Sequence, residues 1–257
     1  MPIFVVTGSI GAGKSELSEE LRDNFMRDFP QRDVHLFKES VDVNLLKLIY
    51  DPASHEGLAT REGVLTFFQA KKQHERWQHV VEAKRLSALG DIVIMDTDPL
   101  HDAVFARVNL DAESLALYEA FLDYYDRKIG FTPDVRISLH RSVSTSYANI
   151  LTRAAEAPLE RESELAIPIE YLERLTQEFF KTFKSAHRFT ATVEMVIISN
   201  GFEVPYEELR GFVEAGCTEK SIRMVFDKSL GLDVLKTLDG EDAMDALPDL
   251  TALVLAS

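Results

Sequence analysis

The feature that most constrains the fold is a glycine-rich segment close to the start of the chain. It comprises eight residues that match the pattern G-x-x-x-x-G-K-[ST]: Gly8, Ser9, Ile10, Gly11, Ala12, Gly13, Lys14 and Ser15. A short apolar run at residues 3–7 precedes it, and a helical pattern at residues 15–29 follows it. Glycines allow the backbone to curl so that successive N–H groups point at phosphate oxygens, and the helix N-terminus adds its positive end. The segment therefore predicts a phosphate-binding loop (P-loop) for a nucleoside triphosphate, in which Lys14 reaches the β- and γ-phosphates and the Ser15 hydroxyl ligates Mg²⁺.

The rest of the chain alternates short apolar runs, typical of buried strands, with longer helical patterns. Further strands are predicted at residues 34–37, 91–96, 135–139 and 193–199. Helices are predicted at residues 66–89, 115–128, 169–185 and 206–214. Strands separated by helices pair in parallel through right-handed crossovers. We therefore expect an α/β fold of the P-loop NTPase type, a three-layer sandwich with a five-stranded parallel sheet flanked by helices and a helical lid.

Length and charge limit the domain organisation and the partners. The chain has 257 residues, a formal net charge of −15 and a single cysteine, Cys217. We expect one domain at residues 1–216, with its lid at about 152–166, and a C-terminal extension at residues 217–257. An acidic chain without a Lys/Arg run repels polymeric nucleic acid and anionic membranes, so neither is expected as a partner.

The chain shows no sign of export or membrane insertion. No apolar stretch reaches the roughly 18 residues of a membrane span, and the chain opens almost directly on a predicted strand without a charged leader. A single cysteine excludes an intramolecular disulfide and fits a reducing compartment. A cytoplasmic location is expected.

An acidic residue follows the third predicted strand. Asp96 stands where an acid would hold Mg²⁺ through water in a P-loop protein, although an aspartate at a strand end can also simply start a turn. No Asn/Thr-Lys-x-Asp signature for guanine is present, which disfavours a GTPase.

Several other segments add to the P-loop. In chain order they are Lys38-Glu39-Ser40-Val41, Tyr50-Asp51-Pro52, Thr66-Phe67-Phe68-Gln69 with Arg76 seven residues later, Ile167-Pro168-Ile169-Glu170-Tyr171-Leu172-Glu173-Arg174-Leu175, and Asn200-Gly201-Phe202. In order and spacing they resemble the deoxynucleoside kinases, the group that includes the deoxycytidine, deoxyguanosine and mitochondrial thymidine kinases. The resemblance extends to about Leu209. It implies a nucleotide-salvage enzyme that transfers the γ-phosphate of ATP, with Mg²⁺, to the 5′-hydroxyl of a deoxynucleoside. It also implies a homodimer formed through the long helices at residues 66–89 and 115–128.

The resemblance assigns roles on the phosphate side of such a site. Glu39 would be the general base for the 5′-hydroxyl, and Lys14 and Arg161 would stabilise charge on the transferring phosphoryl group. Phe202 would stack near the adenine of ATP, and Asp96 would bind the metal together with the P-loop serine.

On the nucleoside side, the resemblance implies a second group of residues. Gln69 would pair with the edge of the base, since an amide offers both a donor and an acceptor. The others implied to contact or support the nucleoside are Tyr50, Phe68, Arg76, Asp102 and Glu164.

Two departures from the family pattern concern positive charge. The family has Glu-Arg-Ser after the third strand, whereas this chain has Asp96-Thr97-Asp98. In the lid, Arg161 fits one expected arginine, but Leu159 occupies the position of another, which Arg153 could replace. Lost cations would weaken stabilisation of the transition state.

Three functional hypotheses follow from this pattern. The first is a deoxynucleoside kinase, and the second is a kinase for a nucleoside monophosphate or a modified nucleoside. The third is a kinase-like nucleotide-binding subunit without effective catalysis. Thr97 and the small number of arginines in the lid support this hypothesis. An arginine such as Arg107 or Arg153 directed at the phosphate site would favour catalysis.

Overall fold

The computed structural model describes residues 1–39, 61–157, 161–185, 191–198, 204–217, 221–226 and 236–238. Its centre is one sheet of seven strands in the order β2-β3-β1-β4-β5-β6-β7. The strands are β1 (Ile3–Gly8), β2 (Val34–Phe37), β3 (Ile92–Met95), β4 (Val135–His140), β5 (Val193–Ile198), β6 (Ser221–Phe226) and β7 (Lys236–Leu238). All neighbouring strands pair in parallel except β6 and β7, which are antiparallel. The predicted parallel sheet β2-β3-β1-β4-β5 is confirmed, and two strands from the C-terminal part extend it.

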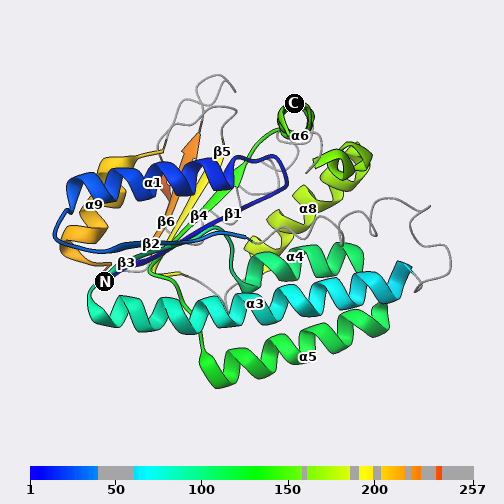
Figure 1. Ribbon diagram of the computed structural model, residues 1–257, viewed down its shortest axis with the longest axis horizontal. Coiled ribbons are helices and arrows are strands. Elements are labelled where there is room, and N and C mark those ends of the chain that lie inside the picture. The colour runs from blue at the N-terminus through cyan, green and yellow to red at the C-terminus, as the bar shows by residue number, and fades with distance from the viewer. Residues whose placement is uncertain are drawn as a thin grey trace.

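Helices cover both faces of this sheet (Figure 1). The helices are α1 (Lys14–Asp28), α3 (Arg61–Leu89), α4 (Pro99–Asn109), α5 (Ala112–Ile129), α6 (Val143–Glu156), α8 (Ile169–Ser185) and α9 (Tyr206–Ala215), with a 3-10 helix, η2 (Glu162–Ala166). One face packs on α1 and α9, whereas α3, α4 and α5 contribute to the core on the other. The three-layer arrangement predicted from the sequence is confirmed.

Strand burial explains why the sheet is sandwiched. In β3, Ile92 and Ile94 belong to the core beneath α1, whereas Val93 and Met95 belong to the core beneath α3. Successive side chains of a strand point to opposite faces, so a strand that is apolar at every position must be covered on both sides. The continuous apolar runs in the sequence are the direct cause of the two helical layers.

Two helices were not predicted from the sequence. Helix α4 follows β3 and α6 follows β4, and both contain small or polar residues that dilute the helical pattern. Side-chain capping marks their starts: Asp98 accepts a hydrogen bond from the His101 N–H, and Ser142 accepts one from the Thr145 N–H. The region predicted as a helical lid begins in the last turn of α6 and ends in η2.

The sheet topology determines where a site can form. Strands β1 and β3 are parallel neighbours, with Val5 opposite Met95. Their carboxyl ends therefore lie side by side, and the segments that follow them face the same crevice, which is where open α/β sheets bind ligands. Among the described helices, none is long and apolar enough to cross a bilayer.

Candidate active site

The P-loop has the backbone geometry that its glycines predict. Gly11 has φ 78° and Gly13, the residue before α1, has φ 90°, values in the left-handed region that favours glycine. A Cβ atom on Gly11 would collide with the backbone carbonyl of Ser146. Asn149 donates a hydrogen bond to the Gly11 carbonyl at 2.9 Å. Helix α6 therefore packs directly against the loop, and only glycine allows that approach.

Ser15 and Asp96 meet at the adjacent ends of β1 and β3. The Ser15 hydroxyl donates a hydrogen bond of 2.6 Å to Asp96 Oδ2, while the buried Oδ1 of Asp96 has no hydrogen-bond partner among the described residues. Burial raises the pKa of Asp96, although Lys14 and the Ser15 hydroxyl oppose the shift. A hydroxyl and a carboxylate are oxygen ligands of the kind that Mg²⁺ prefers, and a cation would compensate the buried charge. The residues present therefore fit a magnesium site.

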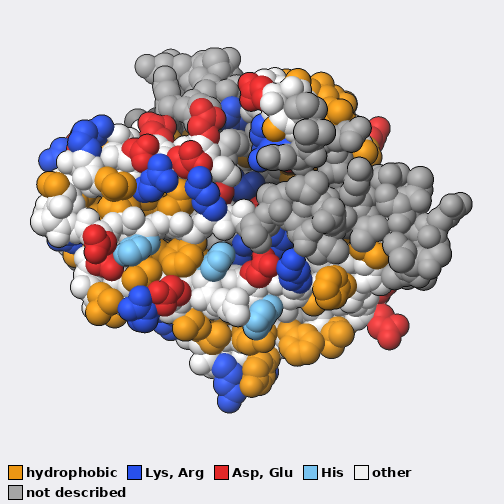
Figure 2. Space-filling model, viewed as in Figure 1, with side chains coloured by type: hydrophobic (Ala, Val, Ile, Leu, Met, Phe, Trp, Pro, Cys, Tyr) orange, Lys and Arg blue, Asp and Glu red, His pale blue; other side chains and the backbone are white. Residues whose placement is uncertain are grey.

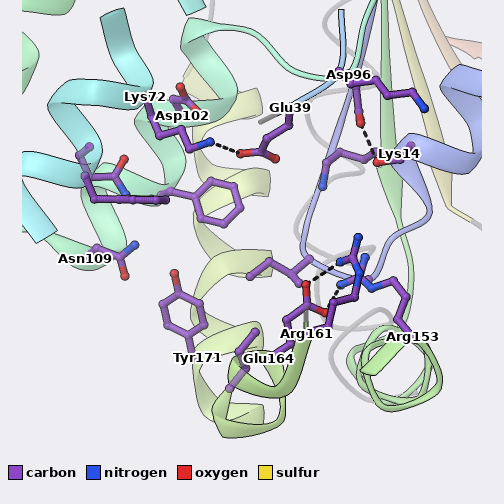
Figure 3. A pocket seen from close by; sticks show the side chains of 18 of the residues that line it. Lys14, Glu39, Lys72, Asp96, Asp102, Asn109, Arg153, Arg161, Glu164 and Tyr171 are labelled. Atoms are coloured by element: carbon purple, nitrogen blue, oxygen red, sulfur yellow. Dashed lines mark hydrogen bonds and ion pairs between the residues drawn. The ribbon is translucent and has the colours of Figure 1, made fainter. Parts of the chain in front are cut away.

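A cavity of about 320 Å³ opens beside the P-loop (Figure 3). Its walls come from α1, α3, α4, α6, η2 and α8, together with the chain ends after β2 and β3. The charged side chains that line it are Lys14, Glu19, Lys38, Glu39, Lys72, Asp96, Asp102, Arg153, Arg161 and Glu164. Positive and negative groups are equally numerous in this set, so the local charge is far less negative than that of the whole chain.

Glu39 lies between two cations of α3. Arg76 Nη2 donates a hydrogen bond to Glu39 Oε1 at 2.9 Å, and Lys72 Nζ lies 3.6 Å from the same oxygen. Burial alone would raise the pKa of Glu39, but Arg76, Lys72 and Lys14 together hold this pKa below its usual range. The carboxylate is therefore ionised at neutral pH and faces the cavity in a form that can accept a proton.

Arg76 and Asp102 form a buried ion pair at the cavity wall. Arg76 is fully buried, and its Nε lies 3.1 Å from Asp102 Oδ2. Burial raises the pKa of Asp102 to about 6, against the opposing effect of Arg76. Asp102 lines the cavity, whereas Arg76 supports both carboxylates from the side away from it.

A second buried cation holds the start of α4. Arg136 on β4 contacts Asp98 Oδ2 at 2.7 Å and Glu194 Oε1 on β5 at 2.8 Å. Asp98 is also the residue that caps α4. Because Asp102 lies in the first turns of this helix, the ion pairs below it position its carboxylate in the cavity wall.

The lid arginines converge on one carboxylate. Arg153, from the end of α6, contacts Glu164 Oε2 at 2.8 Å, and Arg161, which precedes η2, contacts Glu164 Oε1 at 2.7 Å. All three residues line the cavity on the side of the P-loop lysine (Figure 3). By contrast, Arg107 pairs with Glu119 and Thr182 and does not line this cavity. Of the two arginines considered from the sequence, Arg153 is the one placed beside the P-loop.

The structure brings most of the residues singled out from the sequence to this cavity. Phe68 and Gln69 line it from α3, together with the groups described above. Thr97 is buried behind Asp96 and does not line it. Tyr50 and Phe202 fall outside the described residues, so their roles stay predictions.

Seven of the described residues that line the cavity were not predicted as site residues: Glu19, Lys38, Lys72, Phe105, Asn109, Ile167 and Tyr171. Lys72, Asn109 and Tyr171 come from α3, α4 and α8 and are directed into the same space (Figure 3). Lys72 follows Gln69 by three residues, so it lies one helical turn along the same face. That spacing was a usable signal for Lys72. Asn109 lies at the end of a helix that the sequence did not predict, so it had no such signal.

Comparison with known proteins agrees with this geometry. The family model "Deoxynucleoside kinase" matches residues 4–211. No relative with a curated description matches the sequence. The fold is similar to that of deoxyadenosine kinase from M. mycoides with bound dATP, at 22% identity and a TM-score of 0.59, over 84% of this chain and 100% of that chain. The same kinase with bound dCTP gives 20% identity and a TM-score of 0.59, over 83% of this chain and 99% of that one. The chain therefore belongs to the deoxynucleoside kinase family and is a phosphotransferase that acts on deoxynucleosides.

Proposed function

We propose that this kinase transfers the γ-phosphate of ATP to the 5′-hydroxyl of a deoxynucleoside, with Glu39 as the general base. The observation that carries the proposal is the Glu39 carboxylate, which lines the same cavity as the P-loop lysine and the lid arginines and contacts two cations of α3. A general base needs that position, because it must take a proton from the hydroxyl that attacks the γ-phosphate.

The phosphate side supplies positive charge from three elements. Lys14 starts α1, Arg153 lies in the last turn of α6 and Arg161 precedes η2. Together with the backbone N–H groups of the P-loop, these cations would bind the phosphates and stabilise charge on the phosphoryl group in transfer. The Ser15 hydroxyl and the Asp96 carboxylate would hold Mg²⁺, which, when bound, neutralises charge between the β- and γ-phosphates.

The acceptor side favours a nucleoside over a nucleoside monophosphate. The described cations there are already paired with carboxylates: Lys72 with Glu39, and Arg76 with both Glu39 and Asp102. A phosphorylated acceptor would need additional positive charge, because its phosphate carries up to two negative charges. Gln69 offers a donor and an acceptor for a base edge, and Phe68 offers an apolar face.

Transfer of labelled phosphate tests the proposal directly. Wild type and Glu39→Gln are incubated with γ-labelled ATP, Mg²⁺ and a panel of deoxynucleosides and monophosphates. Glu39→Gln keeps the shape but cannot accept a proton, so kcat should fall by about 10²- to 10⁴-fold with little change in the KM for ATP. Transfer only to monophosphates, or a Glu39→Gln enzyme as active as wild type, would contradict the proposal.

We also propose that two copies associate through the outer surface of α5. Three of the large hydrophobic side chains on this helix are half exposed: Leu117, Phe121 and Tyr124. Hydrophobic side chains gather along the lower edge of the molecule in Figure 2, where α5 runs in Figure 1. Their spacing places them on one stripe of the helix, which is the pattern expected for helix-to-helix packing between subunits. A cytoplasmic location remains a prediction that rests on the sequence.

A further inference from the structure

Lys72 lines the cavity but belongs to neither the P-loop nor the lid. It is 4% exposed, although it carries an ammonium group that normally stays in water. Its Nζ lies 3.6 Å from Glu39 Oε1 and 3.7 Å from Glu75 Oε2, and 5.6 Å from the centre of the Phe68 ring. A buried ammonium is retained at such a position only where carboxylates compensate its charge.

Lys72 and Arg76 approach the same atom. Both ion pairs with Glu39 fall on Oε1, at 3.6 Å and 2.9 Å. In Figure 3 the Lys72 side chain reaches across the cavity wall to one oxygen of the Glu39 carboxylate. Two cations on one oxygen restrict the rotation of the carboxylate, which would let its other oxygen, Oε2, face an acceptor hydroxyl.

We infer that Lys72 is a positioning residue for Glu39, holding Oε1 so that Oε2 accepts the proton of the attacking hydroxyl. The inference rests on the proposed function, in which Glu39 is the base. In the step itself, the hydroxyl oxygen forms a bond to the γ-phosphorus, the bond between that phosphorus and the β–γ bridging oxygen breaks, and the hydroxyl proton passes to Glu39 Oε2. Lys72 contributes by orienting the base and by stabilising its charged form before the transfer.

The charges around Glu39 indicate that Lys72 influences the pH at which Glu39 becomes ionised. Lys72 and Arg76 face it from α3 and Lys14 faces it from α1, while the charges of Asp96, after β3, and Asp102, on α4, also interact with it. The two aspartates favour the protonated form of Glu39, and the three cations favour the ionised form. Removal of one cation therefore raises the pH at which Glu39 becomes ionised.

The test compares Lys72→Met with Lys72→Arg and with a neighbouring control. Lys71→Met removes a lysine from the same helix whose side chain is 38% exposed and does not line the cavity. In Lys72→Met we expect kcat to fall at least about tenfold with the KM for ATP unchanged, because an unoriented base loses part of its contribution. The acid limb of the kcat/KM profile should move up by about one pH unit. Lys72→Arg should restore most of kcat and the original limb, and Lys71→Met should match wild type.

Other outcomes separate this inference from the proposed function. An unchanged kcat and acid limb in Lys72→Met would overturn the role of Lys72. So would a change confined to the KM for the nucleoside, which would make Lys72 a substrate contact. Retained transfer in Glu39→Gln would instead remove Glu39 as the base, whatever Lys72 does. If Lys72→Met does not fold, Lys72→Gln, which is neutral but polar, carries the same test.

Discussion

Ser15 and Asp96 stand 81 residues apart in the chain, yet the hydroxyl of the first donates a hydrogen bond of 2.6 Å to the carboxylate of the second. The contact exists because β1 and β3 are parallel neighbours, so the P-loop that follows β1 and the residue that follows β3 lie at the same edge of the sheet. It brings together a hydroxyl and a carboxylate whose second oxygen, Oδ1, has no hydrogen-bond partner among the described residues.

Asp96→Asn should raise the Mg²⁺ concentration needed for half-maximal activity and remove most of the activity. The amide keeps the shape but removes the negative charge that compensates a divalent cation, so kcat should fall by about two orders of magnitude. Steady-state kinetics over a titration of MgCl₂ would measure this. Asp91→Asn, on the same chain segment but remote from the cavity lining, is the matched control. Unchanged Mg²⁺ dependence in Asp96→Asn would contradict the metal assignment.

Arg153→Met should lower kcat by about 10²-fold, because a methionine fills the space but cannot stabilise charge on the transferring phosphoryl group. Glu164 would keep only Arg161 as its ion-pair partner among these two arginines. Arg107→Met removes an arginine that pairs outside the cavity and should leave kcat within about twofold of wild type. Equal losses in the two variants would show that Arg153 acts only through stability.

His140 should make the fold sensitive to acid. It is 5% exposed on β4 and stacks on Phe180 at 4.3 Å between ring centres, and burial lowers its pKa from 6.5 to about 4. The folded-state pKa lies below the unfolded value, so the unfolded chain binds the proton more tightly and stability is lost as the pH falls from 6.5 towards 4. At pH 5 this effect lowers the free energy of unfolding by about 2 kcal/mol.

In His140→Phe the ring stack can be kept while the titrating group is removed. The loss of unfolding free energy between pH 7 and pH 5 should therefore be smaller than in wild type by about 2 kcal/mol, as measured by urea unfolding at each pH. His74→Gln, at an exposed position on α3, should lose as much unfolding free energy between pH 7 and pH 5 as wild type. Burial also lowers the pKa of His101 well below 6.5, so some acid sensitivity should persist in the His140 variant.

Phe121→Asp should convert the proposed dimer into a monomer, because a carboxylate placed in the apolar stripe of α5 would have to be desolvated at the interface. Light scattering coupled to gel filtration at micromolar concentration would measure the mass. Asp123→Ala changes an exposed residue of the same helix, removes only a surface ion pair with Arg127, and should leave the dimer intact. A wild-type protein that is monomeric at these concentrations would refute the proposed association.

The local order of elements could be read directly from the residues. The apolar β-branched runs, the glycine-rich loop and the long helical periods gave five strands and five helices in the right places, because these patterns depend on neighbours a few residues apart. Helices α4 and α6 were missed because their starts are set by side-chain caps at Asp98 and Ser142 and their faces mix small and polar residues. Strand β6 was missed because Ser221 and Arg223 interrupt its apolar run, and β7 was missed because it is only three residues long.

The sequence by itself determined the phosphate-binding loop, since its chemistry lies within Gly8 to Ser15 and needs only a strand before it and a helix after it. Tertiary structure decided the acceptor half of the site, where Glu39, Lys72 and Asp102 come from three separate elements and neighbouring charges shift the pKa of both carboxyl groups. Long-range packing sets these distances, and the electrostatic effect of a neighbour depends on distance and burial rather than on position along the chain. The contact between the Lys72 ammonium and Glu39, on which the proposed positioning role rests, is therefore set by the tertiary structure.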